Sequence, residues 1–541
     1  MSASSLADRT NALRARLSVA IPPQAGQRSF VRLFVLFAAL GTLWALATPL
    51  MAYPDEPSHT IRAAAVVRGQ VAVEPGQSFG NGVHAQVPSQ IANLEAQKCF
   101  AFYRERTADC APEIPAGDNF NVIGVTSAGT YNPLYYWAVG LPSLVLTGAA
   151  NIYAMRIVSV VASALFYAAA FRALGQLRKP KWPTLAASVS VTPMILFLSS
   201  GINPNSIEIA ATMAAFCGLL AVLDNSNKLQ TVVPAIFTVG VSAAVLANTR
   251  SVSLVWLFCA VVTAALFFRW SQIRPLLANR YVWGASCLAA IGVVLGLVWI
   301  FVGMNAPPST GTAPEGIANP APGVPLYRAF LTMLDRTFDF IPQYVGVVGW
   351  LDTPVPQAAI AYWSLLFIAL LLLALLAKPR KLLWGALFAL GALAIVPAAL
   401  QASLVTTVGF FWQGRYNLPL VLIALVSAGM AMRTQHFPQG SKSRAIARIL
   451  IVTAVVAHVL SFLYVLRRYV VGIEEISNWQ TMISQPSWQP PLGWFALTVL
   501  YAVVLATAAH RLYAYLYPGH RLLRVPVRRT RFKPGTEPGK R

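Results

Sequence analysis

The run Phe30-Val-Arg-Leu-Phe-Val-Leu-Phe-Ala-Ala-Leu-Gly-Thr-Leu-Trp-Ala-Leu-Ala-Thr-Pro-Leu50 is long and apolar enough to cross a membrane as a helix. A polar, basic segment precedes it and no convincing small-residue cleavage site follows, so we expect a retained first span rather than a signal peptide. Over its 541 residues the chain is 57% hydrophobic and 11% charged. These proportions exclude a soluble globular protein and predict an all-α, polytopic integral membrane protein.

Further apolar runs of similar length follow along the chain. With the first, they lie at residues 30–50, 153–176, 182–200, 205–223, 230–247, 251–268, 282–304, 357–377, 382–403, 414–432, 446–466 and 493–514. The stretch 131–148 is ambiguous, because proline occurs early and in the middle of it and aromatic residues gather at one end. About twelve transmembrane helices are expected if 131–148 does not cross.

The distribution of charge decides the topology of 131–148. The chain has 41 Lys and Arg against 18 Asp and Glu, a net charge of +23. If 131–148 does not cross, most of the basic residues lie on the side of both termini, as the positive-inside rule requires of the cytoplasm. If it crosses, the later basic loops face outward. We therefore expect 131–148 to be a re-entrant or interfacial helix, and both termini to be cytoplasmic.

This topology divides the chain into four parts. They are a basic cytoplasmic N-terminus, 1–29, a transmembrane core, 30–432, C-terminal transmembrane helices, 433–516, and a basic cytoplasmic tail, 517–541. Two long extracytoplasmic loops interrupt the core: 51–152, expected to carry juxtamembrane helices, and 305–356. We expect the positive charge to attract lipid headgroups and not nucleic acid.

An acidic pair, Asp55 and Glu56, follows the first span within Ala52-Tyr-Pro-Asp-Glu-Pro-Ser-His59. Ionisable groups at a membrane face of so apolar a chain indicate a site. The alternative is a solvated helix start, with Asp55 near the N-cap and Glu56 in the first turn. His59 either hydrogen-bonds Glu56 or contacts a metal or substrate. The sequence requires no cofactor, but a divalent cation, Mg or Mn, could bind Asp55 and Glu56.

Other polar and aromatic segments fall on the same, extracytoplasmic side. Candidate residues for binding substrate or lipid phosphate are Arg415, Tyr416, Arg250, Tyr131, Tyr135, Asn203, Trp350 and Asp352. An arginine at the interface suits phosphate through its fork of donors. Four of them have a structural alternative: Arg415 as an interfacial anchor, Asn203 as a helix cap, Trp350 as a belt residue and Asp352 in a turn.

Five cysteines are present, and two of them share the first outer loop. Cys99 and Cys110 are expected to form a disulfide in an oxidising exterior. The other three lie in or near spans and are interpreted as apolar filling. Neither a zinc-binding cysteine spacing nor a redox CxxC occurs, so the cysteines indicate no metal site and any metal ligand of this chain is unknown.

The ordered motifs resemble known families. The acidic pair after the first span and Asn132-Pro-Leu-Tyr-Tyr-Trp137 resemble features of the GT-C glycosyltransferase superfamily. More narrowly, the chain is similar from about residue 30 to residue 432 to the bacterial membrane-protein family called domain of unknown function 2142. The motifs of that likeness are Pro54-Asp-Glu-x-x-His59, the loop cysteine pair, Gly201-Ile-Asn-Pro-Asn205, Gly349-Trp-Leu-Asp-x-x-x-Pro356 and Gln413-Gly-Arg-Tyr-x-x-Pro419. Asn132 replaces the usual proline, and Asn205 a frequent aspartate.

The resemblance implies a GT-C-like fold in the bacterial cytoplasmic membrane with an extracytoplasmic active site. Asp55 would be the catalytic base, supported by Glu56 and His59, with Arg415 on the lipid phosphate and Tyr131 to Trp137 lining the cavity. The predicted function is inverting transfer of a sugar from a polyprenyl-phosphate donor to a cell-envelope glycan or lipid acceptor. Two alternatives are a lipid-linked oligosaccharide flippase or other transporter, and a non-catalytic scaffold for envelope assembly.

Overall fold

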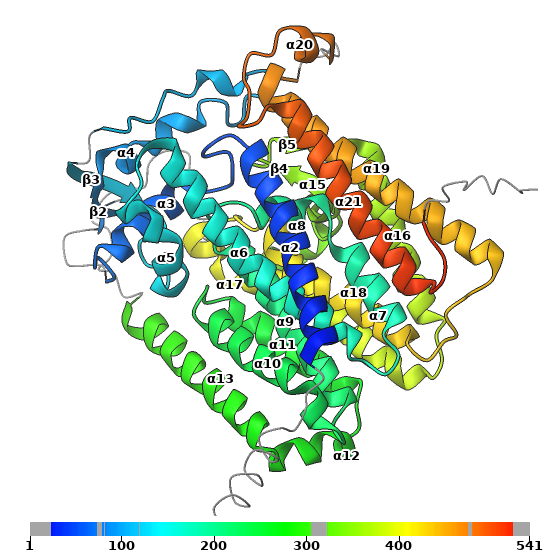
Figure 1. Cartoon of the computed structure of the whole chain (residues 1–541). Coiled ribbons are helices and arrows are strands. Elements are labelled where there is room, and N and C mark those ends of the chain that lie inside the picture. The colour runs from blue at the N-terminus through cyan, green and yellow to red at the C-terminus, as the bar shows by residue number, and fades with distance from the viewer. Residues whose placement is uncertain are drawn as a thin grey trace, which may run out of the picture.

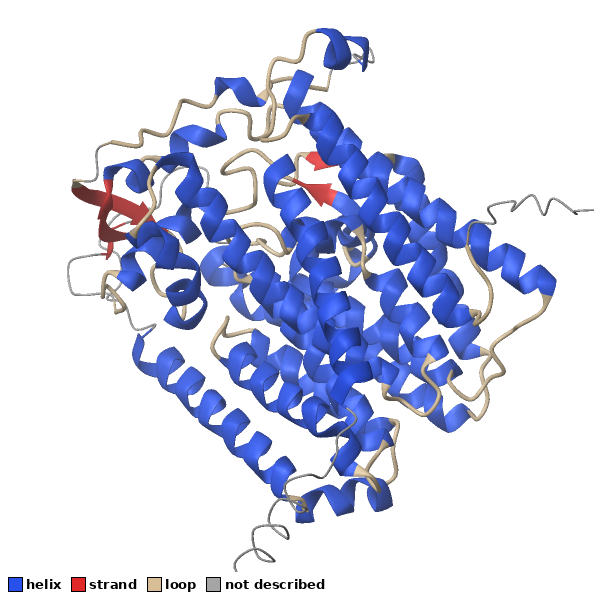
Figure 2. Ribbon diagram, viewed as in Figure 1, coloured by secondary structure: helices blue, strands red, loops and turns tan. Residues whose placement is uncertain are grey.

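The computed structural model describes residues 23–72, 78–79, 82–117, 120–303, 321, 323–473 and 479–522. The predicted basic N-terminus up to residue 22, the Pro/Gly/Ala-rich segment 305–315 and the tail from residue 523 lie outside these residues. Within them the chain is a bundle of long helices, with short strands only toward the upper end of the view (Figures 1 and 2).

Ten helices among the described residues are long and apolar enough to cross a membrane. They are built on α2 (Pro23–Ala47), α6 (Gly148–Gly175), α9 (Asn205–Asp224), α10 (Val233–Ala247), α13 (Arg280–Val298), α16 (Gln357–Leu375), α17 (Leu383–Val408), α18 (Leu418–Met432), α19 (Ser441–Val471) and α21 (Trp494–Leu516). Apolar runs form helices in a membrane because the helix satisfies every backbone hydrogen bond within itself. The prediction of a polytopic helical membrane protein is confirmed.

Two of the twelve expected spans are not single long helices. Residues 182–200 form α7 (Lys181–Ser190) and α8 (Pro193–Leu198), because Pro193 has no N–H to continue α7 and Thr192 caps the new helix through Ile195 N. Residues 251–268 form α11 (Ser253–Leu266), which meets Trp270–Ala278 at a bend of 112°. Counting that bent pair as one span gives up to 11.

The segment between α2 and α6 folds into short helices, which the sequence analysis expected, and a small sheet, which it did not predict. Its helices are α3 (Glu56–Val67), α4 (Ser89–Ala92) and α5 (Pro133–Gly140). The antiparallel sheet has the order β1 (Ser78–Phe79), β2 (Gly82–Pro88) and β3 (Asn121–Thr126). At eight residues α5 is too short to cross a bilayer. It packs on α3, where a Cβ at Gly140 would lie 2.2 Å from the Ala63 carbonyl oxygen.

The remaining short elements cover the same region or connect the long helices. They are α12 (Trp270–Ile273), α14 (Leu326–Asp335), α15 (Ile341–Gly346), α20 (Trp479–Ser484) and the hairpin of β4 (Val347–Val348) and β5 (Thr353–Pro354). This hairpin holds the segment that carries Trp350 and Asp352.

The core of the bundle is built around α9 and α18. Of their most apolar stretches, 89% and 94% are buried, whereas α13 and α21 are only 17% and 22% buried and therefore face the surroundings of the bundle. Helix α9 contacts α6, α10, α11 and α18. The first turn of α9 and the turn that precedes α18 lie beside the segment after α2, and these three places supply the candidate site.

Candidate functional site

Asp55 lies in the turn directly before α3, in a backbone conformation that few residues adopt. Its φ is 59°, in the left-handed region, where Asp and Asn are tolerated better than other non-glycine residues. Asn203 contributes to this turn, because its Nδ2 donates to the Pro54 carbonyl oxygen at 2.8 Å. Such conformations cluster at functional sites.

The Asp55 carboxylate faces Arg415, 360 residues later in the chain. Arg415 Nη2 donates to Asp55 Oδ2 at 2.6 Å. The arginine side chain is 3% exposed, whereas the aspartate side chain is 43% exposed. The pair therefore combines an accessible carboxylate with a buried guanidinium.

Most of the hydrogen-bonding capacity of Arg415 is unused. Nη2 also donates to Tyr416 Oη at 3.1 Å, but Nε and Nη1 are buried and lack a partner among the described residues. A buried donor that lacks a hydrogen-bond partner is costly. A planar fork of charged donors is suited to the oxygens of a phosphate or carboxylate.

Arg250 adds a second cation to the same cluster. The guanidinium carbons of Arg250 and Arg415 lie 4.8 and 5.1 Å from the centroid of the Tyr416 ring. Arg250 Nη1 lies 3.2 Å from Glu208 Oε2 and 3.3 Å from Asn205 Oδ1. Because the buried Glu208 balances its charge, Arg250 is held in place by α9.

The surroundings set the charge states of Asp55 and His59. Burial raises the pKa of Asp55, but the nearby cations, Arg415 first, lower it by more, so that the net pKa is below its usual value. Burial lowers the pKa of His59 to about 3 although Asp55 opposes this shift. At neutral pH the site therefore holds an ionised aspartate and a neutral imidazole.

His59 hydrogen-bonds Tyr136 instead of Glu56. Its Nδ1 lies 2.8 Å from Tyr136 Oη, and its ring centroid lies 5.8 Å from that of Tyr131. Burial raises the pKa of Tyr131, so this phenol stays protonated. Helix α3, helix α5 and the segment just before α5 thus bring His59, Tyr136 and Tyr131 together near Asp55.

Glu56 is committed to an arginine that the sequence analysis did not single out. Arg156 lies in the first half of α6. Its Nε donates to Glu56 Oε1 and its Nη2 to Glu56 Oε2, both at 2.7 Å, and both side chains are fully buried. Arg156 also donates to the carbonyl oxygens of Ala45, Thr48 and Pro49 at the end of α2. This network holds the end of α2 and the start of α3, between which Asp55 lies. An arginine within an apolar run was the signal that could have revealed it.

The donor set does not fit a cation shared by Asp55 and Glu56. Ile202 N also donates to Glu56 Oε1, so both oxygens of Glu56 already have partners. Across the described part of the chain, no group of three or more His, Cys, Asp and Glu side chains could hold a metal.

Three of the other candidate residues bind neighbouring parts of the protein. Tyr135 Oη lies 3.0 Å from Ser159 Oγ, and Trp350 Nε1 donates to the Met51 carbonyl oxygen at 3.1 Å. Asp352 Oδ2 accepts from Phe102 N at 2.8 Å. These contacts join the loops 51–152 and 323–356 to each other and to the bundle.

The loop that contains Phe102 is closed by a disulfide between Cys99 and Cys110. Arg468, in the last turn of α19, donates to the carbonyl oxygens of Phe100, Tyr103 and Arg106 in this loop. Its Nη2 also lies 3.8 Å from Asp352 Oδ2. Like Arg156, Arg468 is a buried arginine that the sequence analysis did not single out.

Comparisons with known proteins place these residues in a family context. The sequence pattern of DUF2142, described as a predicted membrane protein, matches residues 37–425, which include the Asp55 turn and Arg415. No match was found among curated proteins. The structure resembles ArnT from Cupriavidus metallidurans bound to undecaprenyl phosphate, at 11% identity and a TM-score of 0.43, over 90% of this chain and 76% of that one. The structure of ArnT from Cupriavidus metallidurans in the apo state matches at 11% identity and a TM-score of 0.43, over 91% of this chain and 77% of that one.

Proposed function

The chain belongs to the DUF2142 family of predicted membrane proteins, and we propose that this member is a glycosyltransferase. It would move a sugar from a polyprenyl-phosphate donor to a hydroxyl of a cell-envelope glycan or lipid on the extracytoplasmic face of the bacterial cytoplasmic membrane. The observation that carries the proposal is the buried Arg415 guanidinium, with two donors unpartnered among the described residues, beside the accessible Asp55 carboxylate.

Asp55 is the general base of the proposed reaction. The acceptor hydroxyl gives its proton to the carboxylate while its oxygen attacks the anomeric carbon of the donor sugar. The bond between that carbon and the phosphate oxygen breaks, and its electron pair stays with the polyprenyl phosphate. Attack opposite the leaving group inverts the anomeric configuration.

Arg415 binds the phosphate that departs. Its free Nε and Nη1 can donate to phosphate oxygens, on which negative charge increases as the sugar leaves. A cation that stabilises this charge lowers the barrier to transfer.

Donor binding also strengthens the base. The charge of Arg415 lowers the pKa of Asp55 in the protein without donor. A phosphate bound to the same guanidinium offsets part of that charge, so the pKa of Asp55 rises toward its usual value. The carboxylate thus becomes a better proton acceptor when the sugar is present.

The neighbouring residues orient these two groups. Asn203 and the Glu56–Arg156 pair hold the turn that carries Asp55. Arg250 packs on the ring of Tyr416, which also contacts Arg415. Because His59 is neutral, it adds no further positive charge beside Asp55.

The test is transfer of a labelled sugar by the purified, reconstituted protein. The donor is radiolabelled undecaprenyl-phosphate hexose, and the acceptor is envelope material from cells that lack the protein. We expect label to enter the acceptor, and Asp55→Asn to lower the rate by about 10²–10⁴-fold. Asp335→Asn is the matched control, because Asp335 is an exposed acid on α14.

Retention of the wild-type rate by Asp55→Asn overturns the assignment of the base. Absence of transfer by the wild-type protein, together with movement of the labelled lipid across the vesicle membrane, identifies a transporter instead.

A further inference from the structure

A large cavity lies at the end of the bundle opposite Asp55. Its volume is about 990 Å³, and α2, α6, α7, α16, α19 and α21 surround it. Helix α2 lines it with residues 29–40, whereas Asp55 follows the other end of α2. Helix α6 lines it with its last turn, whereas Arg156 lies near the start of that helix. The cavity is therefore separate from the candidate site.

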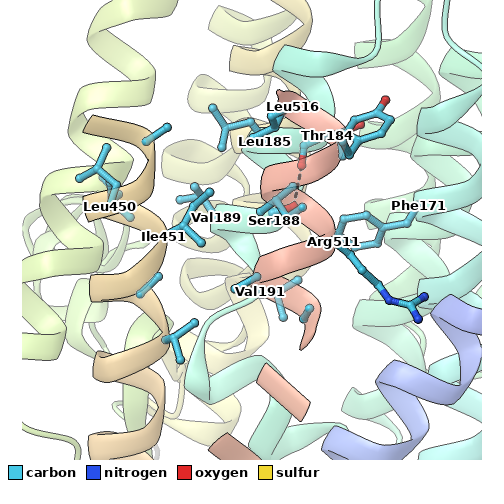
Figure 3. A pocket seen from close by; sticks show the side chains of 18 of the residues that line it. Phe171, Thr184, Leu185, Ser188, Val189, Val191, Leu450, Ile451, Arg511 and Leu516 are labelled. Atoms are coloured by element: carbon cyan, nitrogen blue, oxygen red, sulfur yellow. Dashed lines mark hydrogen bonds between the residues drawn. The ribbon is translucent and has the colours of Figure 1, made fainter. Parts of the chain in front are cut away.

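The walls of the cavity are apolar and its charged groups are all cationic. Figure 3 shows Leu185, Val189 and Ile451 on its walls, with the Arg511 side chain at one side. Arg32, Arg172 and Arg511 come from three different helices, and no Asp or Glu is among the lining residues. Arg172 Nε is buried and without a partner in the described part of the chain.

The three arginines gather at one end of the cavity. Arg32 is in the first half of α2, and Arg172 and Arg511 are in the last two turns of α6 and α21. The positive-inside distribution predicts that this end faces the cytoplasm. The lining aromatics at the same end include Trp182, at the start of α7, as is common where a helix meets the membrane interface.

We propose that this cavity binds one anionic phospholipid of the cytoplasmic leaflet. Its acyl chains would lie along the apolar walls, and its phosphate would accept hydrogen bonds from the arginines. The volume is near the upper end of the range of ligand sites, about 300–1,000 Å³. The sequence from residue 523 is a poor occupant, because it is itself strongly basic and would meet the arginines with like charge.

The test measures which lipids stay bound to the purified protein. The protein is held in nanodiscs of equal parts phosphatidylglycerol and phosphatidylcholine, released, and weighed by native mass spectrometry. We expect one phosphatidylglycerol per chain in preference to phosphatidylcholine. Replacing two arginines, Arg172→Gln with Arg511→Gln, should lower its retention by about 30-fold.

A second variant fills the cavity without changing charge. Ala508 lines the cavity on α21, and Ala508→Trp should expel the lipid. The control is Ala506→Trp, because Ala506 is exposed on the same helix and does not line the cavity. The charge control is Arg380→Gln, at an exposed arginine outside the cavity. The thermal midpoint of each variant checks that it is folded.

Three results overturn the proposal. One is equal retention of the two lipids by the wild-type protein. Another is wild-type retention of phosphatidylglycerol by the folded double arginine variant or by folded Ala508→Trp. The third is displacement of phosphatidylglycerol by an equal amount of undecaprenyl phosphate, which would assign the cavity to a prenyl lipid.

Discussion

Replacing the adjacent acids Asp55 and Glu56 one at a time should separate catalysis from stability. Both substitutions, Asp55→Asn and Glu56→Gln, remove one negative charge and keep the shape of the side chain. The surroundings of the two carboxylates differ: the Asp55 side chain is 43% exposed and the Glu56 side chain is fully buried. We therefore expect opposite patterns of damage.

Glu56→Gln should mainly destabilise the fold. It leaves the fully buried Arg156 without its counter-charge, and breaking a buried ion pair from one side costs about 3–5 kcal/mol. Asp55→Asn also removes the counter-charge of a buried arginine, Arg415, but the aspartate side chain is 43% exposed and Asn still accepts from that guanidinium. Its cost should therefore be smaller, at most about 2 kcal/mol. Asn also tolerates the left-handed backbone at this position. Its transfer rate should nevertheless fall by about 10²–10⁴-fold.

The protein contains its own probes for the stability measurement. Cys217 and Cys259 are buried free thiols, so a fluorogenic maleimide reacts with them only as the bundle opens. The exposed Cys287 reacts at once and sets the baseline. Transfer is expressed per folded molecule in the same samples.

The order of the unfolding midpoints decides the outcome. A Glu56→Gln protein as stable as the wild type would refute the role of the Glu56–Arg156 pair. An Asp55→Asn protein that unfolds earlier than Glu56→Gln would show that Asp55 is chiefly structural.

Three further predictions follow from the same contacts. Arg415→Lys keeps the charge but loses the fork of donors, so the KM for the lipid donor in initial-rate measurements should rise by about 10–100-fold; an unchanged KM contradicts phosphate binding. His59, with its pKa lowered to about 3, remains neutral in the fold while the unfolded chain takes up a proton below about pH 6.5. Stability is therefore complete above that pH and should fall by about 1.4 kcal/mol from about pH 7.5 to about pH 5.5 in unfolding titrations, and His59→Asn should lack this part of the dependence. Cys110→Ser opens a disulfide loop of sequence separation 11 and should cost about 3 kcal/mol, with no further effect of reductant on the unfolding midpoint; a midpoint equal to that of the wild type contradicts the cross-link.

The long helices could be predicted from the sequence because membrane burial leaves a strong signal in hydropathy. The runs 282–304 and 357–377 correspond closely to α13 and α16. The run 182–200 misled the prediction, because hydropathy does not register the backbone break at Pro193. The sheet was missed although Val83, Ala85 and Val87 alternate with polar residues, a pattern typical of a half-buried strand.

The candidate site was only partly predictable. Asp55, Arg250 and Arg415 stand out because charge is scarce, and the structure brings them together. Their pairings depend on the packing of distant helices, which no local pattern encodes. The same holds for Arg156, whose partner lies 100 residues away, and for Asp352, whose main contact is a backbone N–H of another loop.

The Glu56–Arg156 pair also bears on how the chain enters the membrane. An arginine in an inserting helix costs about 2.5–3.5 kcal/mol at the bilayer centre, and less near an interface. Glu56 and the carbonyl groups at the end of α2 precede Arg156 by about 100 residues, so they are synthesised before α6 reaches the insertion machinery. The charge of Arg156 can therefore be paired with Glu56 as soon as α6 packs against α2. On this basis we expect α2 and α6 to be the first pair of helices to assemble, with the contacts of Asn203 and Ile202 to the Asp55 turn added when α9 follows.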